Sequence, residues 1–196
     1  MAQYFPTELA SLYFIIVVIL WILGEIIGST ITPAIRRRGV EIERKDKGSR
    51  IIIFVGTFLA IFIAFELKAY NIGTLPEWMT YFGTTLMLMG VIFRQWSISV
   101  LGKYFSQSIG IQKGQKIVKS GPYRYVRHPS YTGAFLIWLG IGFALQSWVA
   151  VIIILVIYGL IFGYRMKMEE EMLISEFGDE YKQYMKTTKK IIPFIL

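Results

Sequence analysis

The sequence contains no cysteine and only one histidine, His128, among its 196 residues. Disulfides, thiolate metal ligands and cysteine nucleophiles are therefore excluded. A single imidazole also argues against a zinc or di-metal site, because such sites draw on several His or Cys ligands. No strand is followed by a Gly-x-Gly-x-x-Gly turn, so we expect no Rossmann domain. The first segment lacks a basic start and a small-residue cleavage site, which predicts a retained span rather than a signal peptide.

What the sequence has in abundance is long apolar runs. It is 55% hydrophobic with a mean hydropathy of +0.53, and several runs approach the ~20 residues that a helix needs to cross a bilayer. We therefore predict an all-α integral membrane protein with about five transmembrane helices, at Leu9–Gly28, Ile51–Tyr70, Trp78–Leu101, Pro129–Leu145 and Trp148–Tyr164. The short Gln146-Ser147 connection predicts a tight hairpin of the last two spans. The sequence shows no linker or internal repeat, so we expect residues 1–196 to form one domain, with the first three spans in residues 1–101.

The basic residues indicate the orientation in the membrane. The net charge is +8, and 19 of the 21 Lys and Arg residues lie between the first two spans, between the third and fourth, or from Arg165 onward. The positive-inside rule then places the N-terminus outside and the C-terminus in the cytoplasm. The basic loops are thus topology signals rather than nucleic-acid contacts, and the run Arg36–Arg50 is expected to touch lipid headgroups.

A few charged residues fall inside the predicted spans. Glu25 and Arg94 lie at similar depth in the first and third spans, and an unpaired charge there costs roughly 3 kcal/mol on insertion scales. We predict that the two residues form an ion pair between neighbouring helices; a substrate role is the alternative. Glu66 and Lys68 lie near the outer end of the second span, where they can extend toward the headgroups.

Two clusters on the cytoplasmic side could carry chemistry. In the first, Gln112 to Tyr131, Gly121-Pro122 indicates a turn and Pro129 suits the first position of a helix. His128 would then cap that helix, whose N-terminus favours an anionic group such as a carboxylate. The alternative is that His128 simply anchors the turn at the membrane interface.

The second cluster follows the fifth span. Arg165 and Glu169 are four residues apart and share a helix face. They form either a solvated ion pair or a site in which arginine holds a carboxylate in a bidentate fork. The helix continues beyond Tyr164 as an amphipathic segment that Gly178 interrupts, and its apolar stripe either packs at the interface and on the loops or gates a substrate. The stripe consists of Met168, Met172, Leu173, Phe177, Tyr181, Tyr184 and Met185.

Together these segments resemble the isoprenylcysteine carboxyl methyltransferase family. The resemblance rests on "IVKSGPYRYVRHPSY", "RMKMEE" and "FGDEYKQY" in residues 112–196. It implies an integral membrane enzyme that uses S-adenosylmethionine and releases S-adenosylhomocysteine, with residues 102–196 as the cofactor-binding and catalytic part. The short chain is typical of prokaryotic members, whose location would be the cell membrane.

The resemblance also implies roles for individual residues. The cofactor pocket would be lined by Gln112, by Gln115, Lys116, Ile117 and Val118, and by Tyr123. The amino-acid end of the cofactor would lie against His128, Pro129, Ser130 and Tyr131. Glu169 would bind the cofactor from the second cluster and Arg165 would orient the acceptor. The family commonly has histidine at the position of Gln115, which keeps a hydrogen-bond donor but no charge.

The acceptor and the competing functions stay open at this point. A lipophilic carboxylate such as an isoprenylcysteine-like molecule needs no general base, whereas an amine or thiol acceptor would have to lose a proton, with a glutamate or His128 as the candidate base. "RHPxY" also occurs in membrane sterol reductases, so an NADPH-dependent reductase is one alternative. A membrane scaffold without activity is another. The sequence does not name the oligomeric state.

Overall fold

The computed structural model describes residues 4–36, 42–44 and 48–192. Most of the chain is helical, with one short β-ribbon. In chain order the elements are α1 (Glu8–Leu23), the π-helix η1 (Gly24–Ile31), α2 (Thr32–Arg36), β1 (Ile42–Arg44), α3 (Ser49–Ala69), α4 (Met79–Leu101), the 3₁₀ turn η2 (Gly102–Tyr104), β2 (Gly110–Gln112), the 3₁₀ turn η3 (Gly121–Arg124), α5 (Pro129–Ala144), α6 (Trp148–Phe177) and α7 (Asp179–Thr187).

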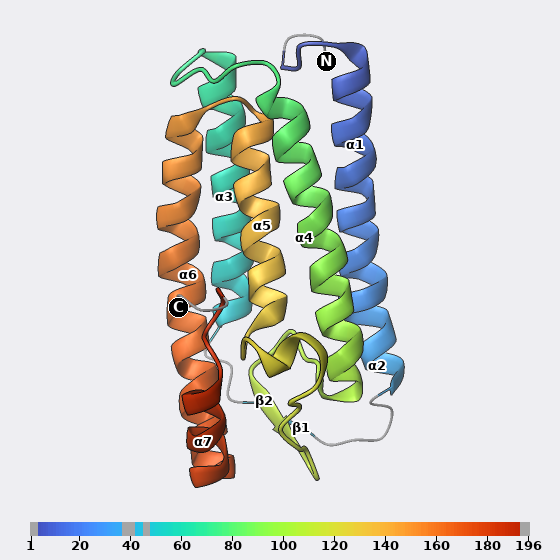
Figure 1. The fold of residues 1–196 in the computed structure, drawn as a ribbon, viewed down its shortest axis with the longest axis vertical. Coiled ribbons are helices and arrows are strands. Elements are labelled where there is room, and N and C mark those ends of the chain that lie inside the picture. The colour runs from blue at the N-terminus through green and yellow to red at the C-terminus, as the bar shows by residue number, and fades with distance from the viewer. Residues whose placement is uncertain (1–3, 37–41, 45–47, 193–196) are drawn as a thin grey trace.

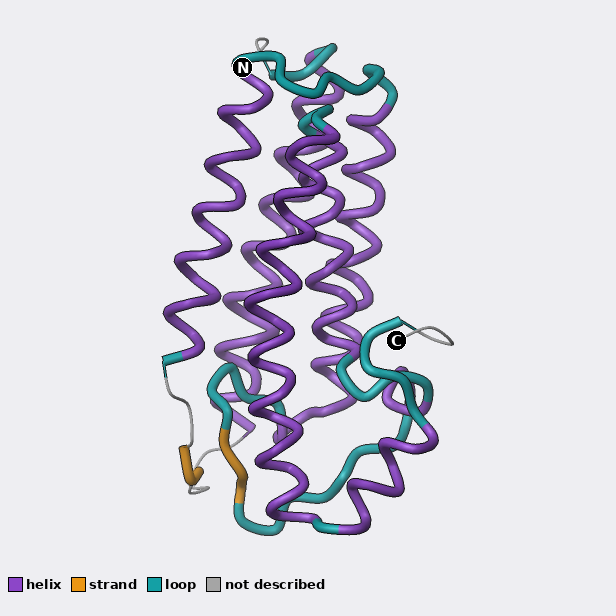
Figure 2. Tube along the Cα trace, turned by 90° about the vertical axis from the view of Figure 1, so that its left-hand side faces the viewer, coloured by secondary structure: helices purple, strands orange, loops and turns teal. Residues whose placement is uncertain are grey.

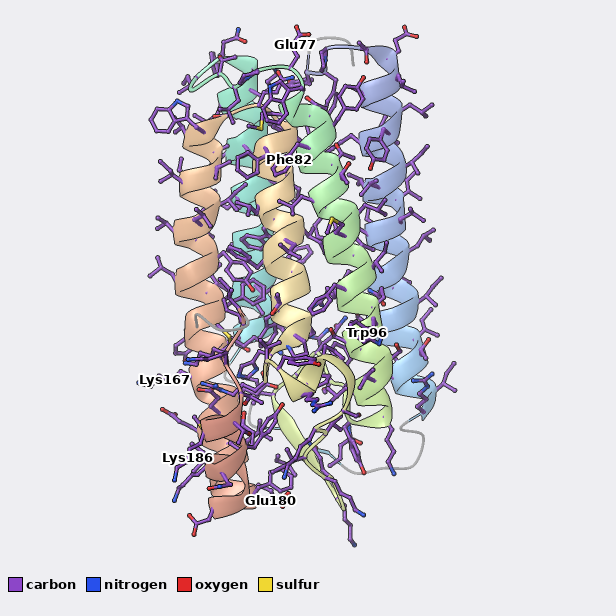
Figure 3. The ribbon with its side chains drawn as sticks, in the orientation of Figure 1. Glu77, Phe82, Trp96, Lys167, Glu180 and Lys186 are labelled. Carbon is purple, nitrogen blue, oxygen red and sulfur yellow. The ribbon has the colours of Figure 1, made fainter. Side chains whose placement is uncertain are left out.

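The helices α1, α3, α4, α5 and α6 run side by side as an elongated bundle (Figure 1). The N-terminus and the connections α3–α4 and α5–α6 lie at one end, which we call the hairpin end. The β-ribbon, η3 and α7 lie at the other, which we call the loop end, and the turned view in Figure 2 shows the same division. Glu77 marks the hairpin end in Figure 3, and Lys186 and Glu180 mark the loop end.

Lengths and hydropathy confirm an all-α membrane protein. Among the described residues, four helical segments are long and apolar enough to span a bilayer: Glu8–Arg36, Ser49–Ala69, Met79–Tyr104 and Trp148–Phe177. The fifth, α5, has 16 residues, or ~24 Å at 1.5 Å per residue, less than the ~30 Å hydrocarbon core. The loops that precede α5 lie beyond its first turn, at the loop end (Figure 1).

Glycines allow α4 and α5 to touch through their backbones. A Cβ added to Gly83 would lie 2.2 Å from the backbone nitrogen of Ala144, and one on Gly140 would lie 2.5 Å from the carbonyl oxygen of Gly83. Nearer the loop end, a Cβ on Gly90 would lie 2.8 Å from the carbonyl oxygen of Gly133. Close backbone approach through small residues is a common way for helices to associate in membranes, where no hydrophobic force favours contact between them.

The Gln146-Ser147 turn forms the tight hairpin expected from the sequence. Gln146 adopts a positive φ of 56°, and its side-chain nitrogen Nε2 donates to Thr80 Oγ1 over 2.8 Å. Lys68 was predicted to extend toward the headgroups; its Nζ donates to Gln146 Oε1. The turn offers Lys68 a buried acceptor, so this lysine fastens α3 to the hairpin.

Two features of the loop end were not expected from the sequence. β1, within the charge run Arg36–Arg50, pairs antiparallel with β2, with Ile42 opposite Gln112. The rest of that run, residues 37–41 and 45–47, lies outside the described residues. The helix that starts at Glu8 also extends to Arg36 through a π-helical segment, several residues beyond its predicted end.

The amphipathic segment after the fifth span packs onto the loops. α6 runs to Phe177 and ends at Gly178, whose φ is 54°, at the interruption expected from the sequence. Met172 forms a small buried cluster with Ile109 and Ile111 next to β2. The stripe thus joins α6 to the loops that precede α5.

Candidate functional site

A cavity of about 550 Å³ opens at the loop end, beneath the short helix α5. One part of it lies between the spanning helices and is apolar, with α3, α5 and α6 contributing Phe54, Phe58, Ile61, Ile137, Trp138 and Phe162. The other part lies among the loops and is more polar, with Gln115, Lys116, Tyr123, His128, Glu169 and Tyr181. The cavity can therefore bring an apolar molecule from the bilayer next to a polar one from solution.

Tyr131 contacts residues of both parts, and its ring packs edge-to-face on Phe162 with centroids 5.5 Å apart. The Tyr131 hydroxyl donates to Glu169 Oε2 over 2.7 Å and accepts from Arg165 Nε over 2.9 Å. Tyr131 belongs to the first turn of α5, whereas Arg165 and Glu169 are one turn apart on α6. The tight hairpin brings these two helices together, so the tyrosine links the two members of the second cluster.

Arg165 is held from three directions. Besides Tyr131, its Nη1 donates to Ser49 Oγ over 2.6 Å, and its Nη2 donates to the carbonyl oxygen of Gln107. The residue is 4% exposed. Its positive charge is therefore fixed in place by groups from α3, from the loop after η2 and from α5. Arg165 is not a solvated partner of Glu169, which was the simpler of the two interpretations of this cluster.

His128 is buried beside a second carboxylate, Glu170. Its Nε2 lies 3.1 Å from Glu170 Oε1, and its Nδ1 lies 3.8 Å from Glu169 Oε2. The imidazole stacks on Tyr131 with ring centroids 5.5 Å apart. Arg127 Nε donates to the same Glu170 oxygen over 2.5 Å. Arg127 and Glu170 were not among the candidate residues, although both are adjacent in sequence to residues that were.

Glu25 and Arg94 form the predicted pair, and both line the cavity. Arg94 donates to Glu25 through Nε and Nη2 over 2.5 and 3.0 Å. Its Nη1 donates to the carbonyl oxygen of Ser130 over 3.0 Å. The pair therefore ties the helix of Glu25 to α4 and also supports the first turn of α5.

Most of the candidate cofactor residues lie together on the cavity wall. They are Gln115, Lys116, Ile117, Val118, Tyr123, His128, Ser130, Tyr131, Arg165 and Glu169. Gln112 and Pro129 are buried but do not line the cavity. Gln112 Nε2 donates to the carbonyl oxygen of Lys103 over 2.7 Å, and Pro129 starts α5 as expected.

Gln115 has a structural contact that explains how glutamine fits this position. Its Oε1 accepts from the backbone nitrogen of Gln112 over 3.0 Å, and its own backbone nitrogen donates to the Gln112 carbonyl over 2.9 Å. The side chain closes the turn that leads into the 115–118 stretch. Its amide NH₂ group is the donor that it can present to a ligand.

The N-terminus of α5 offers fewer free donors than a regular helix. Pro129 has no N–H, the Tyr131 nitrogen donates to the His128 carbonyl, and the His128 nitrogen donates to Lys190. Within the part of the chain that the structure describes, the Ser130 nitrogen is the first-turn donor without a hydrogen bond. Anion binding here would depend on this N–H and on side chains rather than on a row of backbone groups.

Tyrosines surround the polar part of the cavity in their neutral form. Burial raises the pKa of Tyr123 and Tyr181 above the ordinary value, and nearby Glu169 adds to both shifts. Burial also raises the pKa of Tyr184, against the opposing effect of Arg127, and its hydroxyl donates to the Tyr123 carbonyl over 2.6 Å. These phenols therefore act as hydrogen-bond donors and as aromatic walls.

Comparisons with known proteins agree on one family. The family model for the isoprenylcysteine carboxyl methyltransferase (ICMT) family matches residues 83–175. Protein-S-isoprenylcysteine O-methyltransferase B of Arabidopsis thaliana is 34% identical over 60% of this chain and 61% of its own length. Protein-S-isoprenylcysteine O-methyltransferase of Schizosaccharomyces pombe is 36% identical over 48% of this chain and 46% of its own length.

A solved structure gives the same result. The eukaryotic intramembrane Ras methyltransferase ICMT superposes with a TM-score of 0.59 at 26% identity, covering 74% of this chain and 52% of that one. The chain thus spans about half to three fifths of the length of the relatives it matches. The matched region contains α5, the hairpin and the Arg165–Glu170 segment of α6. These comparisons make the chain similar to the isoprenylcysteine carboxyl methyltransferase family over the part that holds the candidate site.

Proposed function

We propose that the protein is an integral membrane methyltransferase that transfers a methyl group from S-adenosylmethionine to the carboxylate of a lipophilic, isoprenylcysteine-like acceptor. The observation that carries the proposal is that apolar residues of the spanning helices and polar residues of the loops line one cavity, with the hydrogen-bonded Arg165 and Tyr131 on its wall. A water-soluble cofactor and a lipid-soluble acceptor have to meet at such a boundary. The family relationship supports the same reaction class.

The residues of the polar part fit the cofactor. Glu169 lines the cavity with a side chain 30% exposed, so its carboxylate can accept from an ammonium group or from ribose hydroxyls. The Ser130 N–H can donate to a carboxylate. Tyr123, Tyr181 and Phe177 provide aromatic walls against which an adenine ring can pack. These groups can therefore bind the amino-acid, ribose and adenine parts of S-adenosylmethionine, although the protein has no Rossmann-type nucleotide-binding domain among its described residues.

The mechanism depends on positioning. When bound, S-adenosylmethionine supplies an electrophilic methyl group that a carboxylate oxygen accepts without first losing a proton. Arg165 would orient the acceptor carboxylate, since its charge is fixed by Ser49, Gln107 and Tyr131. The apolar part would hold the acceptor tail, and the loops beneath α5 would exclude water. No residue has to act as general base in this scheme.

The first test separates this function from the two alternatives. S-adenosylhomocysteine should raise the unfolding temperature of the detergent-solubilised protein, because a ligand at 100 times its Kd stabilises the folded state by about 2.7 kcal/mol. NADPH at the same concentration should not. Stabilisation by NADPH alone would identify a reductase, and stabilisation by neither ligand would favour the scaffold.

The second test concerns the acceptor. The protein in lipid vesicles should transfer a labelled methyl group to a prenylated N-acetylcysteine, giving a base-labile ester. The matched control is the same molecule with its carboxyl group converted to an amide, which should accept nothing. Equal labelling of both molecules would rule out the carboxylate as the acceptor group.

A further inference from the structure

After α7 the chain turns back toward the bundle (Figures 1 and 2). Residues 188–191, which we call the C-terminal strap, run along the segment that leads into α5. The Lys189 nitrogen donates to the Tyr125 carbonyl over 3.1 Å. In return, the nitrogens of Arg127 and His128 donate to the carbonyls of Lys189 and Lys190 over 2.9 and 3.0 Å. The strap therefore fixes the backbone of His128.

Side chains fasten the strap on both sides. Thr132 Oγ1, in the first turn of α5, donates to the Ile191 carbonyl over 2.6 Å. Arg127 Nη1 donates to the Thr188 carbonyl over 2.8 Å. The Lys190 ammonium lies 3.3 Å from Glu170 Oε2. The strap is thus tied to α5, to the residue before His128 and to α6.

Glu170 is the point where these contacts converge. One of its oxygens accepts from Arg127 and contacts His128 Nε2, and the other faces Lys190. The residue is 7% exposed, and a buried carboxylate is stable only when it is paired and hydrogen-bonded. The contact with Glu170 therefore fixes the position of the Nε2 edge of the His128 ring, and stacking on Tyr131 fixes the orientation of the ring plane.

Neither Glu170 nor the strap lines the cavity, whereas Arg127, His128 and Glu169 do. Any effect of Glu170 or the strap on a ligand has to pass through the residues that they hold. The His128 side chain makes no capping hydrogen bond to α5, so the helix itself does not orient the ring.

We propose that Glu170 and the C-terminal strap are positioning elements of the cofactor site, which fix the His128 ring so that it presents its Nδ1 edge, on the Glu169 side, to the ligand. This inference rests on the proposed function, because it assigns His128 to cofactor binding. Glu169 would contact the ligand directly, and Glu170 would act through His128. The C-terminal residues would then be part of the site although they are distant in sequence from its motifs.

A double-mutant cycle on the full chain tests the inference. S-adenosylhomocysteine binding to the detergent-solubilised protein is measured by calorimetry for the parent, Glu170→Gln, His128→Ala and the double variant. Glu170→Gln should weaken binding about tenfold, the scale of one charge-assisted contact. In the His128→Ala background the same substitution should have little further effect, because residues that act as a unit are not additive.

A second pair of variants tests the strap without altering a buried carboxylate. Thr132→Val with Lys190→Met removes two of the three side-chain ties, leaving that of Arg127, while keeping similar shapes, and should weaken binding roughly fivefold. The matched control, Lys186→Met with Thr187→Val, changes exposed residues of the same types on α7 and should bind like the parent. This pair also serves if Glu170→Gln fails to fold.

The outcomes separate the two proposals. If the parent does not bind S-adenosylhomocysteine, the proposed function fails and this inference fails with it. If the parent binds and the effects of Glu170→Gln and His128→Ala simply add, Glu170 does not act through His128 and the inference alone is wrong. Parent-like binding by the strap variant would likewise overturn the role of the strap.

Discussion

At the scale of single residues, two consecutive glutamates on α6 have different surroundings. Adjacent helix positions point about 100° apart, so Glu169 faces the cavity and Tyr131 while Glu170 faces Arg127 and His128. The sequence motif contains both carboxylates but does not determine which of them faces a ligand. That depends on the rotation of α6 against α5, which tertiary packing sets. Glu170 was therefore missed, whereas Glu169 lies on the cavity wall.

The direct contacts proposed for Glu169 and Arg165 predict different defects. Glu169→Gln should weaken S-adenosylhomocysteine binding about tenfold or more, because it removes the charge that an ammonium or hydroxyl group would meet. Arg165→Lys should leave that binding within about twofold but lower methyl transfer on the order of 100-fold, because an ammonium lacks the planar fork that orients a carboxylate.

Calorimetry and the vesicle assay measure the two quantities for both variants. Glu171→Gln is the matched control, since Glu171 is exposed on the same helix and pairs only loosely with Lys167 at 3.9 Å. It should resemble the parent in both assays. An Arg165→Lys protein that transfers methyl groups at the parent rate would remove Arg165 from the mechanism.

The Glu25–Arg94 pair predicts a stability effect that depends on both partners. Arg94→Met should destabilise the protein by about 3 kcal/mol, because it leaves a partly buried carboxylate without its counter-charge. Combining it with Glu25→Leu should cost less than the sum of the two single changes. Thermal unfolding in one detergent, followed by circular dichroism, gives the comparison. Strictly additive losses would mean that each residue has a separate task, such as contact with a substrate in the cavity.

At the scale of helices, the sequence predicted which helices exist and in what order they follow along the chain. It did not predict how closely α4 and α5 pack against each other. Apolar runs and Pro129 located α5 to within one residue of its observed end, because a membrane span is a composition signal and proline has few allowed positions in a helix. The backbone contact between α4 and α5 was not predicted. Their glycines are spread among larger residues, and only the structure shows that Gly83 and Gly90 meet Gly140 and Gly133.

This helix contact predicts that a single methyl group is harmful at one position and harmless at another. Gly140→Ala would place a Cβ 2.5 Å from the Gly83 carbonyl, and since backbone cannot move aside easily, we expect a loss of about 1–3 kcal/mol. Gly159→Ala on α6 meets nothing within 4 Å and should be neutral or slightly stabilising. Unfolding in detergent measures both. Equal stability of the two variants would show that α4 and α5 do not approach this closely.

At the scale of the whole molecule, the sequence predicted the membrane class and the site region, whereas the loop end depended on long-range contacts. The β-ribbon joins residues 42–44 to 110–112, and the strap joins residues 188–191 to 125–128. Such short extended segments have no periodicity of their own that a single sequence would reveal. They are held by backbone hydrogen bonds between segments that are far apart in the sequence.

The orientation of the bundle is the remaining prediction, and the absence of cysteine makes it directly measurable. The loop end carries most of the basic residues, so the positive-inside rule places it in the cytoplasm and the hairpin end outside. A single cysteine at Glu77 marks the hairpin end, and one at Lys186 marks the loop end (Figure 3). In intact cells a membrane-impermeant maleimide should label Glu77→Cys and spare Lys186→Cys, whereas permeabilised cells should give labelling of both. Because the cofactor is made and kept in the cytoplasm, labelling of Lys186→Cys in intact cells would contradict the topology and would also place the polar part of the cavity on the wrong side for its proposed ligand.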